Sequence, residues 1–262
     1  MFHSIMLFVY ILSFLFMFLH FFIYNKKAYV AAQTFVIVAV VLNIAVFINK
    51  WVETKSFPAS SLYDVLILTM LFLGIGYLIL FLLYKRPFIS LLVLPFIIAA
   101  GVGSSLSMNI IYQKSYISKF WIYIHLPLTI GGSAFFLISA LIGIIYFIQE
   151  RQLKNKNFGL MFKNFPPIDT INKLNTITLF TGFVLFSGGI ISGIVWGLIE
   201  WDGVLFLTPK FLFAFITWIV FGIIILIKKT KGLTPKKTAL FSVLGILLIL
   251  LTYHGVAVFL IR

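Results

Sequence analysis

Two histidines in apolar surroundings are the side chains best suited to metal chemistry in this sequence. His125 lies about one turn inside an apolar stretch that begins near residue 121, and His254 lies eight residues before the C-terminus inside another. Ionisable residues inside a membrane are costly and usually face the interior of a helix bundle. A neutral imidazole is also a good ligand for haem iron. A single histidine is more simply explained as a hydrogen-bonded packing residue, whereas two at similar depth on different helices favour an axial pair.

Other kinds of reactive chemistry find no support in the sequence. The chain contains no cysteine, which excludes disulfides, thiolate metal sites and covalent haem attachment through Cys-x-x-Cys-His. Any haem would therefore be held non-covalently, and haem b is the hypothesis. The sequence has no P-loop, no His-Glu-x-x-His and no Gly-x-Ser-x-Gly motif. Because no nucleophile is paired with a base by spacing, we expect no enzymatic activity.

Eight long apolar stretches account for most of the chain. Hydrophobic residues make up 62% of the 262 residues and charged residues 10%, and the mean hydropathy is +1.16. A helix needs ~20 apolar residues to cross a membrane. We therefore predict an all-α fold, a polytopic membrane bundle of about eight transmembrane helices that forms a single domain over residues 1–262. The predicted spans are 2–24, 28–49, 60–84, 88–108, 121–148, 175–198, 209–228 and 238–260.

Positive charge gathers in every second connection between these spans. Fourteen of the 20 Lys and Arg residues follow the first, third, fifth and seventh spans. The positive-inside rule makes that side cytoplasmic, so both termini are expected outside. The net charge of +14 then reflects basic loops at the inner leaflet, and we predict no binding of nucleic acid. Two loops with five basic residues each, 149–174 and 228–237, are candidate contacts for a cytoplasmic protein or anionic membrane lipid.

Two groups of small or polar residues have structural explanations. Ser61 and Asp64 form a capping-box-like start for the third span. Glycines at 131–132, 188–189 and 193 would let helices approach closely, and they would equally leave room for a flat ligand. The sequence does not decide between these two roles of the glycines.

Five motifs occur in a fixed order between residues 57 and 218. They read FPASSLYD at 57–64, HLPLTIGGSAF and GIIYFIQERQLK at 125–135 and 143–154, GIISGIVW at 189–196, and PKFLFAFITW at 209–218. Each is weak alone, but together they resemble the cytochrome c assembly (CcsA/CcmC/ResC-like) membrane protein superfamily. The resemblance implies a multi-pass protein of a bacterial cytoplasmic membrane that handles haem.

One segment departs from the pattern of that superfamily. Its members carry Trp-Gly-x-x-Trp-x-Trp-Asp as an outer haem platform, whereas this chain keeps Trp201 and has Leu205, Leu207 and Thr208 at the later positions. Leu226 stands near the place of an inner histidine that some members carry. In its length, its eight predicted helices and this incomplete tryptophan motif, the chain resembles the HemX-type branch of the superfamily.

The resemblance implies a haem-binding regulator of haem biosynthesis, which lowers the level of the cytoplasmic glutamyl-tRNA reductase, or a related haem-handling protein. One alternative is a cytochrome c assembly subunit that presents haem at the outer face to an assembly partner. A second alternative is a haem-free transporter or membrane partner, in which Asp64, Glu200 and Asp202 belong to a polar path.

The haem-binding interpretation assigns a role to six side chains. His125 is expected to be one axial ligand of the iron and His254 the second. Lys210 is expected to meet a haem propionate. The aromatic side chains expected to line the porphyrin are Trp196, Trp201 and Phe206.

Overall fold

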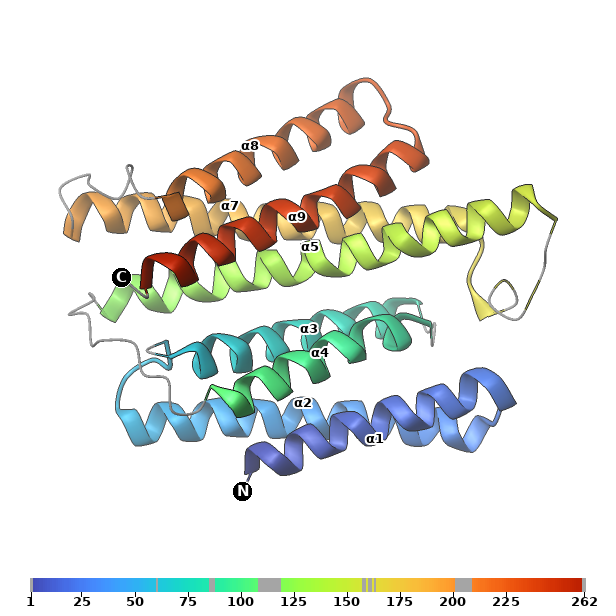
Figure 1. Ribbon diagram of the computed structural model, residues 1–262, viewed down its shortest axis with the longest axis horizontal. Coiled ribbons are helices and arrows are strands. Elements are labelled where there is room, and N and C mark those ends of the chain that lie inside the picture. Colours follow the sequence, from blue (N-terminus) through green and yellow to red (C-terminus); the bar gives the residue numbers. More distant parts are fainter. Residues whose placement is uncertain are drawn as a thin grey trace. The chain divides into compact units, whose positions relative to one another are not determined.

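The computed structural model is all-helical in the residues that it describes (Figure 1). These residues are 2–59, 61–84, 88–107, 119–156, 159, 162, 164–200 and 209–260, without the side chains of 119, 200, 209, 210 and 251–260. The helices in this part are α1 (Phe2–Ile23), α2 (Lys26–Thr54), α3 (Leu62–Tyr84), α4 (Phe88–Leu106), α5 (Lys119–Lys154), α7 (Ile168–Glu200), α8 (Pro209–Thr230) and α9 (Pro235–Leu260).

Each predicted span is confirmed as a helix, although several helices are longer than their apolar stretch. Helix α5 continues to Lys154 and α7 begins at Ile168, because backbone hydrogen bonding does not stop where the hydrocarbon layer ends. Much of the predicted loop 149–174 is therefore helical, and the α8–α9 connection shrinks to residues 231–234. Within the described residues, seven helices are long and apolar enough to cross a membrane, all except α9. The chain is thus a polytopic membrane bundle.

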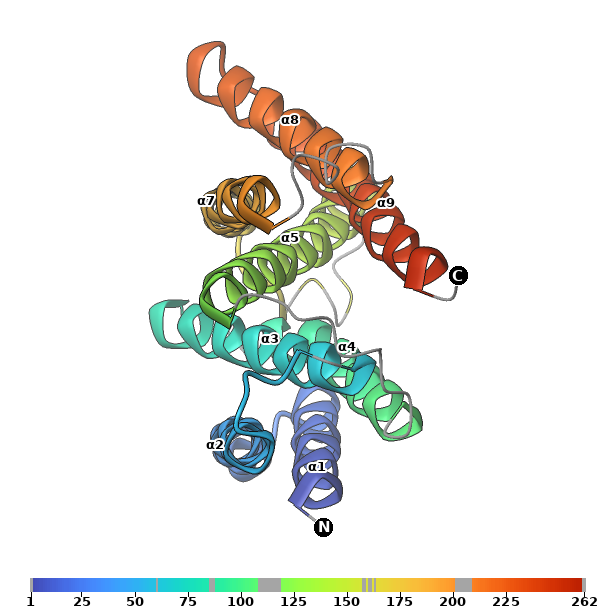
Figure 2. The same cartoon turned by 90° about the vertical axis from the view of Figure 1, so that its left-hand side faces the viewer.

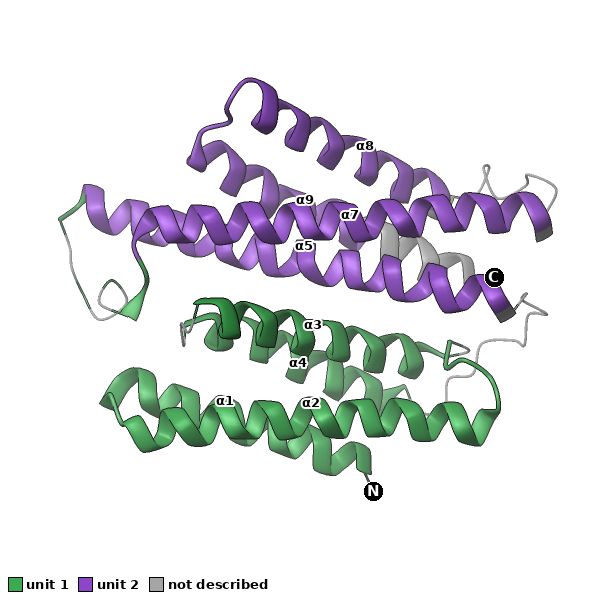
Figure 3. Ribbon diagram, turned by 180° about the vertical axis from the view of Figure 1, so that it is seen from behind, with its two compact units in different colours: residues 1–114, 155–166 green, residues 115–154, 167–262 purple. Residues whose placement is uncertain are grey.

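The described helices group into two compact units (Figure 3). Unit 1 contains α1 to α4, and unit 2 contains α5, α7, α8 and α9. The single domain expected from the sequence stays a prediction, and each unit is described by itself below.

Helix α1 is held in unit 1 by one buried face. Its buried residues recur at the three- and four-residue spacing that places side chains on one side of a helix, and they are His3, Met6, Tyr10, Ser13 and Met17. This face meets α2 and α4, while α3 packs against both of those helices. The capping box at the start of α3 is confirmed: Ser61 Oγ accepts from Asp64 N at 3.2 Å, and Asp64 Oδ2 accepts from Ser61 N at 3.0 Å.

Helix α5 is the central helix of unit 2. It packs against α7 on one side and α9 on the other, and α8 closes the unit against α7 and α9 (Figure 2). The core is aromatic: Phe136 of α5 stacks on Phe221 of α8 with ring centroids 3.9 Å apart, and it meets the Phe186 ring of α7 edge-on. These contacts fix the rotation of α5 relative to α7.

A buried polar node also joins three helices of unit 2. Asn175 of α7 donates from Nδ2 to the Ser139 carbonyl oxygen of α5 at 2.7 Å, and its Oδ1 accepts from Ser242 Oγ of α9 at 3.3 Å. Ser139 Oγ donates in turn to the Asn175 carbonyl oxygen at 3.1 Å. Inside a membrane such groups must find partners in the protein or in ordered buried water, because no bulk water is present to satisfy them.

The α5–α7 contact depends on glycines. A Cβ atom at Gly132 would lie 2.6 Å from Phe186 N and 2.8 Å from Phe186 Cα, and backbone atoms cannot move aside as a flexible side chain can. We expect Gly132→Ala to force the two helices apart and to cost about 1–3 kcal/mol, as overpacking does. The measurement is the thermal midpoint of the detergent-purified protein.

The matched control is Gly222→Ala in α8 of the same unit. A Cβ there would meet only the ring edge of Phe183, at 3.3 Å, so its midpoint should stay near wild type. Equal midpoints for the two variants would contradict the proposed role of the α5–α7 contact.

Candidate functional site

His125 is oriented by a backbone carbonyl of the neighbouring helix. Its Nδ1 lies 2.8 Å from the carbonyl oxygen of Gly189 in α7. A carbonyl oxygen only accepts hydrogen bonds, so Nδ1 must carry the hydrogen. In the neutral ring the lone pair then lies on Nε2. This is the arrangement that a second hydrogen bond imposes on metal-binding histidines, because it fixes both the tautomer and the ring orientation.

Two further residues of α7 surround the His125 ring. A Cβ atom at Gly193 would lie 2.8 Å from His125 Cε1 and 3.0 Å from Nδ1, so the imidazole occupies the space that a larger residue would fill. The Trp196 ring lies one turn further on, with its centroid 5.8 Å from that of His125 and its plane tilted by 55°. The structure therefore brings together two of the predicted site residues, His125 and Trp196.

The backbone around His125 is also held on both helices. Thr129 Oγ1 donates to the His125 carbonyl oxygen at 2.7 Å, and Ser192 Oγ donates to the Gly189 carbonyl oxygen at 3.0 Å. Thr129 lies directly against Gly189, where a Cβ would meet its Oγ1 at 2.5 Å and its N at 3.0 Å. The carbonyl that orients the histidine is thus itself held in a close-packed contact.

The structure decides between the two roles that the sequence left open for these glycines. The space beside Gly132, Gly188, Gly189 and Gly193 is filled by Phe186, Leu128, Thr129 and His125 respectively. These four glycines allow close helix approach, and the alternative that they leave room for a flat ligand is wrong. A flat ligand would have to approach His125 from another side.

The haem-binding roles of all six residues stay predictions, and the side chains of the other four lie outside the described part of the chain. Trp201 and Phe206 lie outside the described residues. Lys210 is in the first turn of α8 and His254 in the last third of α9, but their side chains are also outside the described part. Helix α9 does pack against α5 in unit 2, so His254 belongs to the same unit as His125.

The acidic residues of the predicted polar path are only partly described. Asp64 is buried, with 1% of its surface exposed, and it serves the capping box of α3 in unit 1. The side chain of Glu200 and all of Asp202 lie outside the described residues. The described contacts of Asp64 therefore fit a structural role.

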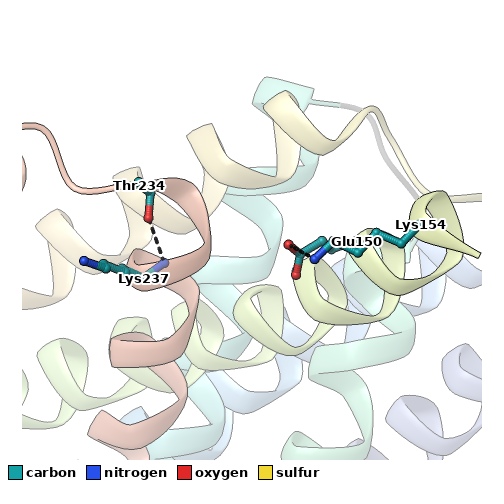
Figure 4. A network of polar contacts seen from close by, with 4 residues as sticks. All are labelled: Glu150, Lys154, Thr234 and Lys237. Atoms are coloured by element: carbon teal, nitrogen blue, oxygen red, sulfur yellow. Dashed lines mark hydrogen bonds and ion pairs between the residues drawn. The ribbon is translucent and has the colours of Figure 1, made fainter.

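Basic residues mark the end of unit 2 that the sequence predicts to be cytoplasmic (Figure 4). Lys154 forms an ion pair with Glu150 at 2.9 Å in the last turn of α5. Thr234 Oγ1 accepts from Lys237 N at 3.4 Å and so caps the start of α9. Lys228 Nζ donates to Thr238 Oγ1 at 2.8 Å and links α8 to α9. These contacts order the basic side chains at this end of unit 2.

The sequence did not predict that the Gly189 carbonyl is the hydrogen-bond partner of His125. The spacing of Gly189, Gly193 and Trp196 does place all three on one side of a helix, which indicates a common contact surface. What the spacing could not supply was which side of α5 faces them.

Comparisons with known proteins agree on one family. The sequence model of the family described as Cytochrome C assembly protein matches residues 1–261. The protein named Cytochrome c biogenesis protein CcsA of Guillardia theta is 28% identical over 232 residues, which cover 79% of this chain and 76% of that protein. The protein of the same name from Trieres chinensis is 27% identical over 91% of this chain and 86% of its own length. That of Prochlorococcus marinus (strain MIT 9515) is 24% identical over 89% and 83%.

The tautomer of His125 can be measured directly. We expect the ¹⁵N spectrum of histidine-labelled protein near neutral pH to show a protonated Nδ1 and an unprotonated Nε2 for His125, assigned by the loss of its signals in His125→Gln. In Gly193→Ala the new methyl group would push the ring away from Gly189, and these signals should shift. A His125 ring protonated at Nε2 instead would contradict the geometry.

Proposed function

The chain belongs to the cytochrome c assembly protein family, and on that premise we propose that it takes part in cytochrome c assembly by holding haem at the end of unit 2 where α5 begins. This end is predicted to face outward, and the membrane is proposed to be the cytoplasmic membrane of a bacterium. The haem is cargo that is passed on to a partner of the assembly machinery.

The observation that carries this proposal is the hydrogen bond from His125 Nδ1 to the Gly189 carbonyl oxygen. It supports haem binding because it directs the lone pair of the neutral ring to Nε2, the atom that would bind iron. Trp196 supplies an aromatic surface beside the ring. His125 and Trp196 would hold one side of a haem b. We propose that His254 would be a second ligand of the iron, that Trp201 and Phe206 would line the porphyrin, and that Lys210 would meet a propionate.

We assign the chain's own side chains a binding role and no catalytic one. His125 would bind and orient the haem, and Trp196 would shield one side of it from water. The names of the similar proteins support a part in cytochrome c biogenesis.

The test is complementation of a deletion strain. We expect deletion to remove c-type cytochromes from haem-stained membranes while total haem b stays normal. The His125→Ala variant should fail to restore them although it accumulates in the membrane. A suitable control is His20→Ala, because His20 also lies 3.0 Å from a carbonyl oxygen, that of Asn25, but in unit 1. Full restoration by His125→Ala would overturn the proposal.

A second candidate function rests on the incomplete tryptophan motif, which keeps only its first tryptophan, Trp201. Leu205, Leu207 and Thr208 stand where the family carries Trp, Trp and Asp, which supports a HemX-type regulator of haem biosynthesis. Its contacts with a cytoplasmic protein would use residues 149–174 and 228–237. This candidate predicts a raised level of glutamyl-tRNA reductase in the same deletion strain, with c-type cytochromes unchanged. The two measurements on one strain therefore separate the two functions.

A further inference from the structure

Unit 1 holds several polar side chains in its interior. Four of them have a polar atom that makes no hydrogen bond within the described part of the chain, namely His3, Tyr10, Gln33 and Asn43. For Tyr10 and Asn43 the exposed fraction is 0%. Both lie well inside membrane-spanning helices, where an unmet donor or acceptor is destabilising because no bulk water is present to satisfy it.

Asn43 differs sharply from the buried asparagine of unit 2. Asn175 is 1% exposed, and both ends of its amide have protein partners in Ser139 and Ser242. Asn43 is equally buried, yet neither its Oδ1 nor its Nδ2 meets hydrogen-bond geometry with any described residue. The same side chain in a similar setting is thus satisfied by protein in one unit and not in the other.

The Tyr10 hydroxyl and the Asn43 amide, which lack hydrogen bonds to the described residues, lie close together between α1, α2 and α3. The Tyr10 hydroxyl lies near the Asn43 side chain, but neither group forms a hydrogen bond of acceptable geometry there. The hydroxyl points at Gly74 of α3, where a Cβ would lie 3.0 Å from it and 2.8 Å from Val40 Cγ2. A larger residue at this position would crowd the hydroxyl, so the glycine leaves it in place.

We propose that Tyr10 and Asn43 form a buried hydration site that binds water inside the membrane-spanning part of unit 1. An amide and a phenol together offer donors and acceptors without a charge, which suits water and does not suit a metal ion. A buried water typically makes 2–4 hydrogen bonds, and the Tyr10 hydroxyl with the two amide atoms of Asn43 supplies that number. The bound water satisfies groups that the surrounding helices leave unmet.

The site can be tested by X-ray radiolysis, which produces hydroxyl radicals from bound water and oxidises the side chains beside it. The full-length protein in lipid nanodiscs is irradiated, and oxidation is quantified by mass spectrometry. Tyr10 should be oxidised several-fold faster than Met17, although Met17 is on the same helix, is 0% exposed and has the more easily oxidised side chain. Oxidation of Tyr10 no faster than that of Met17 would overturn the proposal.

Two leucine variants locate the water. Asn43→Leu should lower the oxidation of Tyr10 to the rate of Met17, because it removes the amide that holds the water. Asn175→Leu changes the matched asparagine of unit 2 and should leave Tyr10 oxidation unchanged. An unaltered Tyr10 rate in Asn43→Leu would show that the water is not held there. If Asn43→Leu fails to fold, the wild-type comparison of Tyr10 with Met17 still decides the question.

Discussion

The close approach of α5 and α7 is the constraint on which the proposed site depends. Glycines at the contact let the two backbones come together, so that a carbonyl of α7 lies within hydrogen-bonding distance of a side chain on α5. A methyl group at Gly132 or Gly189 would meet backbone atoms of the facing helix and so open that distance. The bond then fixes which nitrogen of His125 carries the hydrogen, and hence which nitrogen can bind a metal. Helix packing thus determines the chemistry of the imidazole.

A second constraint is that buried polar groups in a membrane need partners. In unit 2, Asn175 meets this need through serines on two neighbouring helices. In unit 1, Asn43 meets it through water in our proposal. The difference has a consequence for rigidity, because a node made of protein side chains fixes three helices, whereas water adapts to small shifts between them.

The sequence predicted the helices better than their ends. The long apolar stretches predicted every span correctly. An apolar stretch extends only as far as the hydrocarbon layer, so it did not predict the polar ends of α5 and α7, which continue beyond that layer. The capping box at Ser61 was predictable because its two partners are three residues apart. The Gly189 carbonyl was not, because the contact joins residues 64 positions apart and depends on how each helix is rotated. The pairing of His125 with His254 depends on the same kind of information and stays a prediction.

The most direct test of the central claim is an optical spectrum of the detergent-purified protein from haem-replete cells, with a pyridine haemochrome assay. The account predicts a Soret band in wild type that is lost or shifted in His125→Ala and retained in His20→Ala. A wild-type protein without haem, or a His125→Ala protein with an unchanged band, would contradict it.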